Sequence, residues 1–287
     1  MSSGNARRMF VLQYGAEHVT KALSLRGGSP RLYWEPLIGI LVETTNGWVL
    51  LDSGMGRQAL ETPATHQSYE AAAGARDDAD DPWHLYPRPP SDVGKWCWGL
   101  EGDPLTAALA HVGVAVGEIS LAAISHLHLD HSGGIPTLAQ AGVPIAIHSD
   151  ELEFARSGQV DLADGFHAPD WQASSTEWRS LTGDTELAPG VYALATPGHT
   201  PGHLSFRVDL DRSGTWIFAV DAADLAQNFL DRVPCGSVAS ATPEDEARAS
   251  QSLERLLDEA AAADAHLIPG HDQVVFNAIR HPTDGHR

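Results

Sequence analysis

Cysteine is scarce in this chain of 287 residues, which contains only Cys97 and Cys235. The two lie far apart and match no zinc-ligand spacing, and a single pair makes no disulfide framework. We therefore expect two buried free thiols, a state typical of proteins in a reducing compartment.

Positive charge is also in short supply. Lysine and arginine together number 18 against 38 aspartates and glutamates, which gives a formal net charge of −20 with histidine neutral. A chain this acidic repels phosphate backbones and anionic membrane surfaces. The charge therefore argues against nucleic acid as substrate or partner, including the substrate of an RNA-processing nuclease.

Long hydrophobic runs are missing as well. No segment approaches the roughly 20 apolar residues that a membrane-spanning helix needs. The first ten residues include Arg7 and Arg8 but no apolar core of an export signal follows them. We expect no membrane partner and a cytoplasmic location.

The chain is rich instead in short hydrophobic runs that end in turn residues. Asn46 and Gly47 lie between two β-rich runs, 37–42 and 48–52, and this pattern predicts a β-hairpin. Further strands are predicted at 121–124, 143–148, 191–195, 216–220 and 265–268.

Two predicted helices have clear start signals. Asp103 is a good N-cap and Pro104 suits the first turn, with apolar residues following at helical spacing. Thr242 caps a second helix that extends over 243–262. A shorter helix is expected near 149–156.

Residues 57–102 differ from the rest, being polar and rich in Asp and Pro but containing Trp83, Trp96 and Trp98. Tryptophans favour burial, so a disordered linker is not expected. We interpret this stretch as an insertion with a functional loop, within a single domain that covers 1–287.

The densest chemical signal is the run H-L-H-L-D-H at 126–131. Histidine is the commonest metal ligand near neutral pH, and this run places three imidazoles and a carboxylate within six positions. Packing gives no reason for such a cluster. One ion would be crowded by it, whereas two ions can share it, so we predict a two-metal hydrolytic site.

Further ligands are available where later strands end. His199, Asp221 and His271 each follow a predicted strand, and sites often form on loops at strand ends. Taken alone, each would be interpreted as an ordinary turn or capping residue. They indicate a metal site only in combination with the histidine run at 126–131. The nitrogen and oxygen donors suit two divalent ions, Zn²⁺ first, with Mn, Co or Fe also acceptable.

These motifs together resemble the metallo-β-lactamase superfamily, whose signature is H-x-H-x-D-H. The resemblance covers about 10–272 and includes L-D-S-G at 51–54, T-P-G-H-T-P-G-H at 196–203, V-D at 220–221 and P-G-H-D at 269–272. It implies an α+β fold, the αββα sandwich, in which two mixed β-sheets are flanked by helices.

The resemblance also implies a role for each ligand. His126, His128 and His199 would hold one metal, Asp130, His131 and His271 the other, and Asp221 would bridge both. Asp52 resembles the carboxylate that orients a ligand imidazole through its free ring N–H.

Within the superfamily, the chain looks most like the N-acyl-homoserine lactone lactonases, which are quorum-quenching enzymes. It shares their full ligand set, the pattern V-D-A-A at 220–223 followed by N-F at 228–229, and the P-G-H-D ending. The implied reaction opens the ester ring of a lactone by attack of a metal-bridging hydroxide, with Asp221 and Asp130 as catalytic residues. Asp130 would carry a proton to the leaving alkoxide, and the enzyme is expected to form a homodimer by analogy.

One position departs from that pattern. Many of these lactonases have a tyrosine three residues after the bridging aspartate, where this chain has Asp224. An ionised carboxylate cannot donate a hydrogen bond to an oxyanion. Either the metals do that work alone, or Asp224 is protonated, or the substrate differs.

Candidates for the substrate pocket are Met55, Leu129, Asp224, Phe229 and the tryptophans between 83 and 98, although core packing is the stronger explanation for the apolar ones. Other γ- or δ-lactones, a thioester of the glyoxalase-II kind and a β-lactam remain as alternative substrates. A flavin-linked di-iron oxidoreductase would usually have Glu in place of His128. A non-catalytic metal-binding protein is the alternative of a different class.

Overall fold

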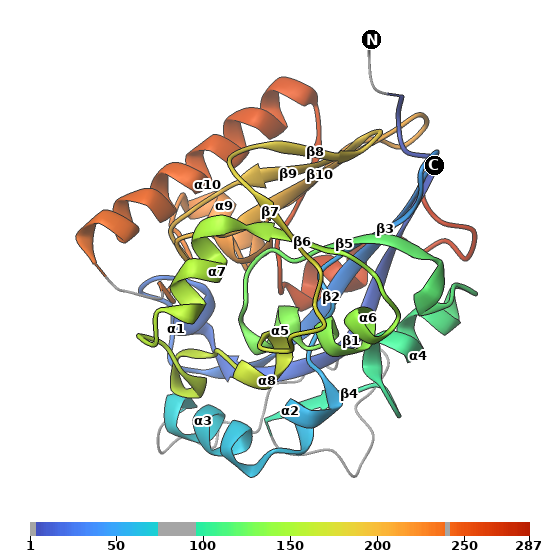
Figure 1. Ribbon diagram of the computed structural model, residues 1–287. Coiled ribbons are helices and arrows are strands. Elements are labelled where there is room, and N and C mark those ends of the chain that lie inside the picture. Colours follow the sequence, from blue (N-terminus) through green and yellow to red (C-terminus); the bar gives the residue numbers. More distant parts are fainter. Residues whose placement is uncertain (1–3, 74–95, 239–241) are drawn as a thin grey trace.

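Two β-sheets lie face to face in the computed structural model, which describes residues 4–73, 96–238 and 242–287 (Figure 1). The larger sheet has the order β4 (Cys97–Gly99), β1 (Arg8–Thr20), β2 (Leu32–Thr44), β3 (Gly47–Leu51), β5 (Ile119–Ala123), β6 (Ile145–His148) and β7 (Trp178–Leu181). The smaller has the order β12 (His266–Ile268), β11 (Gly214–Phe218), β10 (Leu204–Leu210), β9 (Val191–Ala195) and β8 (Thr185–Ala188). Both sheets are mixed, because β3, β5, β6 and β7 pair in parallel, as do β11 and β12, while the other pairs are antiparallel.

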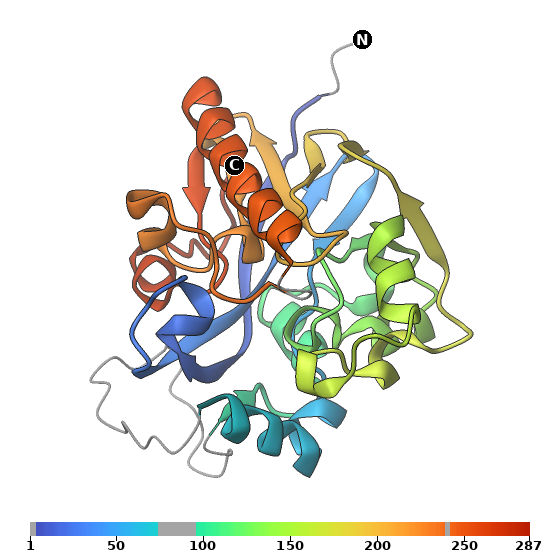
Figure 2. The same cartoon turned by 90° about the vertical axis from the view of Figure 1, so that its left-hand side faces the viewer.

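Helices cover the outer faces of both sheets (Figures 1 and 2). The long helix α10 (Pro243–Ala263) packs Leu253 and Leu256 against Leu194 and Ile217 of the smaller sheet. On the larger sheet, α4 (Pro104–His111) and α6 (Ile135–Gln140) contribute to the outer core. The predicted αββα sandwich is therefore confirmed.

The remaining described helices are short. They are α1 (Lys21–Ser24), α2 (Arg57–Glu61), α3 (Pro63–Ala73), α5 (Leu129–Ser132), α7 (Ser149–Arg156), α8 (Ala168–Trp171), α9 (Ala226–Asp231) and α11 (Gln273–Ala278), with 3₁₀ turns at Val116–Glu118, Leu162–Asp164 and Val220–Ala222.

Local sequence signals account for several of these elements. Gly47 has a φ of 110° in the hairpin between β2 and β3, a conformation that glycine adopts without strain. Asp103 accepts a hydrogen bond from the Thr106 N–H at 2.8 Å at the start of α4. Thr242 accepts one from the Asp245 N–H at 3.2 Å at the start of α10. The predicted hairpin and both helix starts are confirmed.

The stretch 57–102 is more regular than its sequence indicated. Its described part contains α2, α3 and the strand β4, which pairs with β1. In α3 only Thr65 and Ala73 are buried, so the helix has no apolar stripe for a sequence pattern to show. Trp96 and Trp98 are buried, whereas Trp83 lies outside the described residues.

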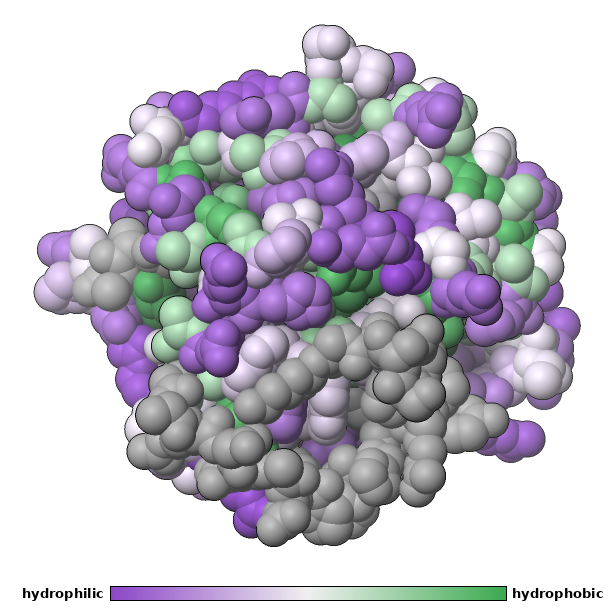
Figure 3. All heavy atoms as spheres, turned by 90° about the horizontal axis from the view of Figure 1, so that it is seen from below, coloured by the Kyte–Doolittle hydropathy of each residue, from purple (hydrophilic) through white to green (hydrophobic). Residues whose placement is uncertain are grey.

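The face in Figure 3 reflects the composition. In its described part, hydrophilic side chains predominate, and hydrophobic ones show only in small separate patches. None of the described helices combines the length and the apolar character that crossing a bilayer would require.

Candidate metal centre

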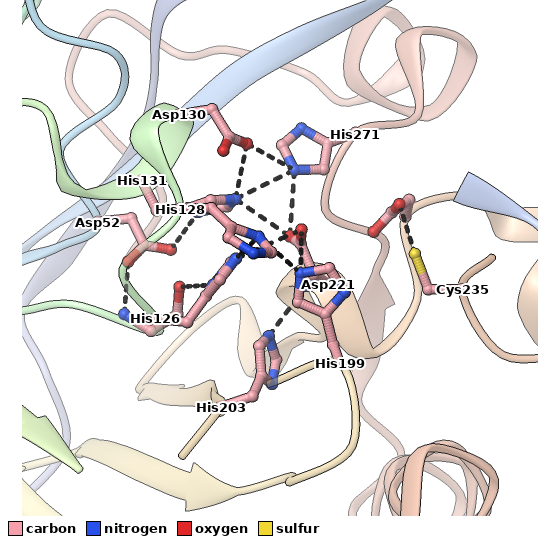
Figure 4. A network of polar contacts seen from close by, with 12 residues as sticks. Asp52, His126, His128, Asp130, His131, His199, His203, Asp221, Cys235 and His271 are labelled. Atoms are coloured by element: carbon pink, nitrogen blue, oxygen red, sulfur yellow. Dashed lines mark hydrogen bonds and ion pairs between the residues drawn. The ribbon is translucent and has the colours of Figure 1, made fainter. Parts of the chain in front are cut away.

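The ends of four strands deliver the predicted ligands to one place (Figure 4). The chain after β5 carries His126 and His128 and then enters α5 with Asp130 and His131. The turns after β9, β11 and β12 carry His199, Asp221 and His271. Val220 has a φ of 51°, which a β-branched residue seldom adopts, and this sharp bend turns the chain directly before Asp221. All seven residues come together.

The first group consists of His126, His128, His199 and Asp221, whose donor atoms all lie within 4.8 Å of one another. The Nδ1 atom of His128 is 2.9 Å from Nε2 of His126 and 3.0 Å from Nε2 of His199. Since the His199 Nδ1–H donates to the carbonyl of Ser237 at 3.0 Å, the Nε2 of that ring presents a lone pair. A single proton on His128 Nδ1 serves only one of its two contacts. A cation between the three rings satisfies all of them, so the group fits a divalent metal.

The second group consists of Asp130, His131, Asp221 and His271. The Nε2 atoms of His131 and His271 lie 3.3 Å apart, and each is 3.1 Å from Oδ1 of Asp221. Both Nδ1–H groups donate elsewhere, that of His131 to Asp52 and that of His271 to the carbonyl of Pro36, each at 3.0 Å. Once the facing Nε2 atoms lose their protons they present lone pairs, so this group also fits a divalent metal.

Asp221 connects the two groups. Its Oδ1 faces His131 and His271, while its Oδ2 lies 3.2 Å from Nε2 of His199 and 3.6 Å from Nε2 of His126. The buried His203 supports Asp221 from behind, because its Nε2 accepts the Asp221 backbone N–H at 3.1 Å.

Electrostatics differ between the two groups. Burial and the neighbouring His199 lower the pKa of His128 to about 3, and burial with the charge of His131 holds the pKa of His126 well below its usual range. In the second group, burial acts to lower the pKa of His131 and His271, but the carboxylates around them outweigh it and raise both. Those same imidazoles overcome the effect of burial on the carboxylates, so the pKa of Asp130 falls to about 2 and that of Asp221 lies well below its usual range.

A cavity of about 390 Å³ opens onto this centre. Leu129 and Asp224, two of the predicted substrate-binding residues, line it, and Leu129 also packs in an apolar cluster with Met55. The other described apolar candidates do not line the cavity: Met55 belongs to the cluster that contains Leu37, Leu60 and Leu129, Phe229 packs against the core beneath α10, and Trp96 and Trp98 belong to small clusters of the larger sheet. For these residues core packing is the observed role.

Asp224 has an unusual partner. The Cys235 Sγ–H donates to its Oδ2 at 2.8 Å, and both cysteines are free and buried, as predicted. Burial and the nearby charge of Asp221 raise the pKa of Asp224 well above its usual range. The pKa direction favours a protonated carboxyl, one of the three alternatives left open by the sequence.

One buried carboxylate was not predicted from the sequence. Glu151, on α7, accepts the backbone N–H of Leu127 at 3.0 Å and that of Gly202 at 3.2 Å. It therefore ties the loop of His126 and His128 to the loop of His199. Burial raises its pKa to about 7. In the sequence Glu151 looks like an ordinary acidic residue in the first turn of a helix, so no local pattern indicates that it connects the two loops.

Two glutamates in the cavity wall were also missed. Glu17 lies on β1 and Glu35 on β2, both are buried, and both line the cavity. Burial raises the pKa of Glu17 to about 7 and that of Glu35 well above its usual range. A single acidic residue in a strand-forming run carries no spacing pattern, so only the fold brings the two together.

The model of the metallo-beta-lactamase superfamily matches residues 39–271. The N-acyl homoserine lactonase of Bacillus cereus is 27% identical over 237 residues, covering 83% of this chain and 81% of the relative. The N-acyl homoserine lactonase AttM of Azorhizobium caulinodans is 25% identical over 272 residues, covering 92% and 93%.

Solved structures show the same fold. A structure of an N-acyl homoserine lactone hydrolase with N-hexanoyl-L-homoserine at its catalytic metal centre aligns with a TM-score of 0.76 at 23% identity, covering 96% of this chain and 97% of the other. The range matched by the superfamily model, 39–271, includes all seven converging side chains.

Proposed function

The chain belongs to the metallo-beta-lactamase superfamily, and on this premise we propose that it opens the ester ring of a lactone at a centre of two divalent metal ions. The names of its relatives confirm the coarser expectation of a metal-dependent ester hydrolase. N-acyl homoserine lactones, which those relatives are named for, are the first candidate substrates.

A single observation carries the proposal: the two oxygens of Asp221 face two separate sets of ring nitrogens at the base of one cavity. A carboxylate placed in this way can bridge two ions. In the proposal His126, His128 and His199 hold one ion and Asp130, His131 and His271 the other. When bound, such ions supply a nucleophile at neutral pH and polarise a carbonyl oxygen. Zinc suits the donor set best.

In this proposal the protein's own residues orient the ligand imidazoles and deliver a proton to the leaving group. Asp52 and the Pro36 carbonyl fix the rings of His131 and His271, and the Ser237 carbonyl does the same for His199. Asp130 is about 9% exposed and lines the cavity, so its carboxyl oxygens can carry a proton to the ring oxygen that leaves. Leu129 and Asp224 would contact the substrate.

The experiment that tests this proposal is a pH-indicator hydrolysis screen with the metal-loaded protein. Its substrates are N-hexanoyl-homoserine lactone, unsubstituted γ- and δ-lactones, nitrocefin as a β-lactam and S-lactoylglutathione as a thioester. We expect ring opening of lactones to exceed hydrolysis of the other classes. Faster turnover of nitrocefin or the thioester would assign a different hydrolase, and lactone binding without turnover in any class would indicate a non-catalytic protein.

A further inference from the structure

Three buried carboxyl groups line the cavity beside the metal centre, and none of them has a role in the chemical step of the proposed reaction. Glu17 is 6% exposed, Glu35 1% and Asp224 3%, and all three line the cavity. A carboxyl oxygen of Glu17, one of Glu35 and a ring nitrogen of His271 lie within 4.8 Å of one another. The acidic wall, as we call Glu17, Glu35 and Asp224, thus begins directly beside the centre.

The basic side chains that line the cavity within the described part of the chain are all histidines. Among the described residues that line the cavity there is neither lysine nor arginine. The wall instead accepts hydrogen bonds from uncharged donors: Tyr69 donates to Glu17, Ser24 and Tyr33 donate to Glu35, and Cys235 donates to Asp224. Buried carboxyls are costly to keep without a charged or strongly donating partner.

Two further polar atoms in this cavity have no partner among the described residues. They are Oδ1 of Asp224 and Oγ1 of Thr65, whose residue is fully buried on α3. Buried polar groups in folded proteins nearly always find a hydrogen-bond partner, so unpaired atoms on residues that line a cavity are consistent with a ligand that completes them. Thr65 stands apart from the carboxyls and gives the same indication independently.

We propose that the acidic wall binds a protonated amine on the substrate, so that the preferred substrates are lactones with an ammonium group close to the reacting carbonyl. The inference rests on the proposed lactonase activity and narrows its substrate class. Since the carboxyl oxygens of Glu17 and Glu35 lie within 4.8 Å of a ring nitrogen of His271, an ammonium bound between them would lie beside the metal centre. A plain alkyl chain lying against the same wall would leave Oδ1 of Asp224 without a hydrogen-bond partner and would give Glu17 and Glu35 no charged one.

The test compares two pairs of probes that differ only in the amine. Homoserine lactone, which has a free ammonium, and γ-butyrolactone, which has none, are compared by kcat/KM in the metal-loaded enzyme. The lactam analogues 3-aminopyrrolidin-2-one and pyrrolidin-2-one are compared by calorimetric binding. We expect the cationic member to be favoured at least about tenfold in each pair, as one charge-assisted hydrogen bond allows.

Variants locate the origin of the preference. Glu17→Gln and, separately, Glu35→Gln should reduce both ratios to within about twofold of unity, whereas the matched control Glu153→Gln, at an exposed position on α7, should leave them unchanged. Two glutamates are tested because either single variant can fail to fold.

The outcomes separate this inference from the proposed function. Hydrolysis of γ-butyrolactone and N-hexanoyl-homoserine lactone without a preference for the ammonium overturns the inference alone. Absence of turnover on every lactone overturns the proposed function and the inference with it. A third metal ion per chain that is lost in Glu17→Gln also overturns the inference, because a cation would then occupy the wall in place of substrate.

Discussion

The carboxylate of Asp52 accepts the Nδ1–H of His131 at 3.0 Å, while its other oxygen accepts the backbone N–H of Ser125 at 2.7 Å. Asp52 has a φ of 60°, in the left-handed region, so the strand end is bent to bring the carboxylate between these partners. One side chain therefore fixes a ring of the second ligand group and the start of the loop that carries the first.

This arrangement predicts the effect of Asp52→Asn. Asparagine tolerates the same backbone conformation, but its amide has one acceptor oxygen for two N–H donors. We expect metal affinity to fall about 10- to 100-fold, the range typical for removing a partner of a ligand histidine. Chelator competition measures it. Asp264→Asn, at an exposed residue with a φ of 49°, is the matched control; equal affinities in the two variants would show that Asp52 does not orient His131.

Removal of single ligands distinguishes the bridging residue from the others. His128→Ala should lose the ion of the first group, whereas Asp221→Ala should weaken both sites, because its two oxygens face different groups. Metal content per chain, measured by inductively coupled plasma mass spectrometry alongside lactone hydrolysis, provides the readout. His111→Ala, at the exposed end of α4, should retain both metal and activity. An active Asp221→Ala variant with full metal content would refute the assignment of the site.

The two groups should respond differently to pH. In the metal-free protein the raised pKa of His131 and His271 keeps these rings protonated near neutrality, so an ion must displace their protons. The lowered pKa of His126, His128 and His199 means that the first group has no such protons to lose. We expect the second ion to bind with proton release and to weaken as the pH falls from 8 to 6, while the first changes little. Calorimetry in buffers of different ionisation enthalpy measures the protons; release that is equal at both sites contradicts the prediction.

Glu151→Gln tests the tie between the ligand loops. The variant replaces an acceptor of two backbone N–H groups by an amide that can accept from only one, so the free energy of unfolding should fall by about 1–3 kcal/mol.

The same variant has a pH signature. Burial raises the pKa of Glu151 from 4.5 to about 7, so the folded state binds the proton more tightly than the unfolded chain. The stability that Glu151 gains from this tighter proton binding is fully present below about pH 4.5 and is lost as the pH rises towards 7. Denaturant unfolding should therefore show a larger difference in the free energy of unfolding between wild type and Glu151→Gln at pH 5 than at pH 7.5. Glu153→Gln, at an exposed position on the same helix, should differ little from wild type in the free energy of unfolding, and that difference should not change with pH.

Much of the fold and the convergence of the seven candidate ligands could be predicted because the signals are local. The run at 126–131 places four donors in one short segment. His199, Asp221 and His271 each follow a hydrophobic run, and in the structure each of these runs forms a strand. Turn and cap residues such as Gly47, Asp103 and Thr242 fixed element boundaries in the same way.

What the sequence could not predict depends on contacts between distant segments. Glu151 reaches Gly202 across 51 positions, and Glu17 and Glu35 meet His271 only because β1 and β2 pass the end of β12. Met55 follows β3 and was a candidate for the substrate pocket, but its side chain packs into the core, the explanation that the sequence favoured. Apolar residues near a site look alike in sequence whether they face the cavity or the core.

The most direct test of the account is a metal titration of the chelator-stripped protein with N-hexanoyl-homoserine lactone as substrate. The account predicts hydrolysis at the background rate without metal and a rise in rate that ends at about two ions bound per chain. A metal-free protein that hydrolyses the lactone at full rate, or a protein loaded with two ions that hydrolyses no lactone, would contradict it.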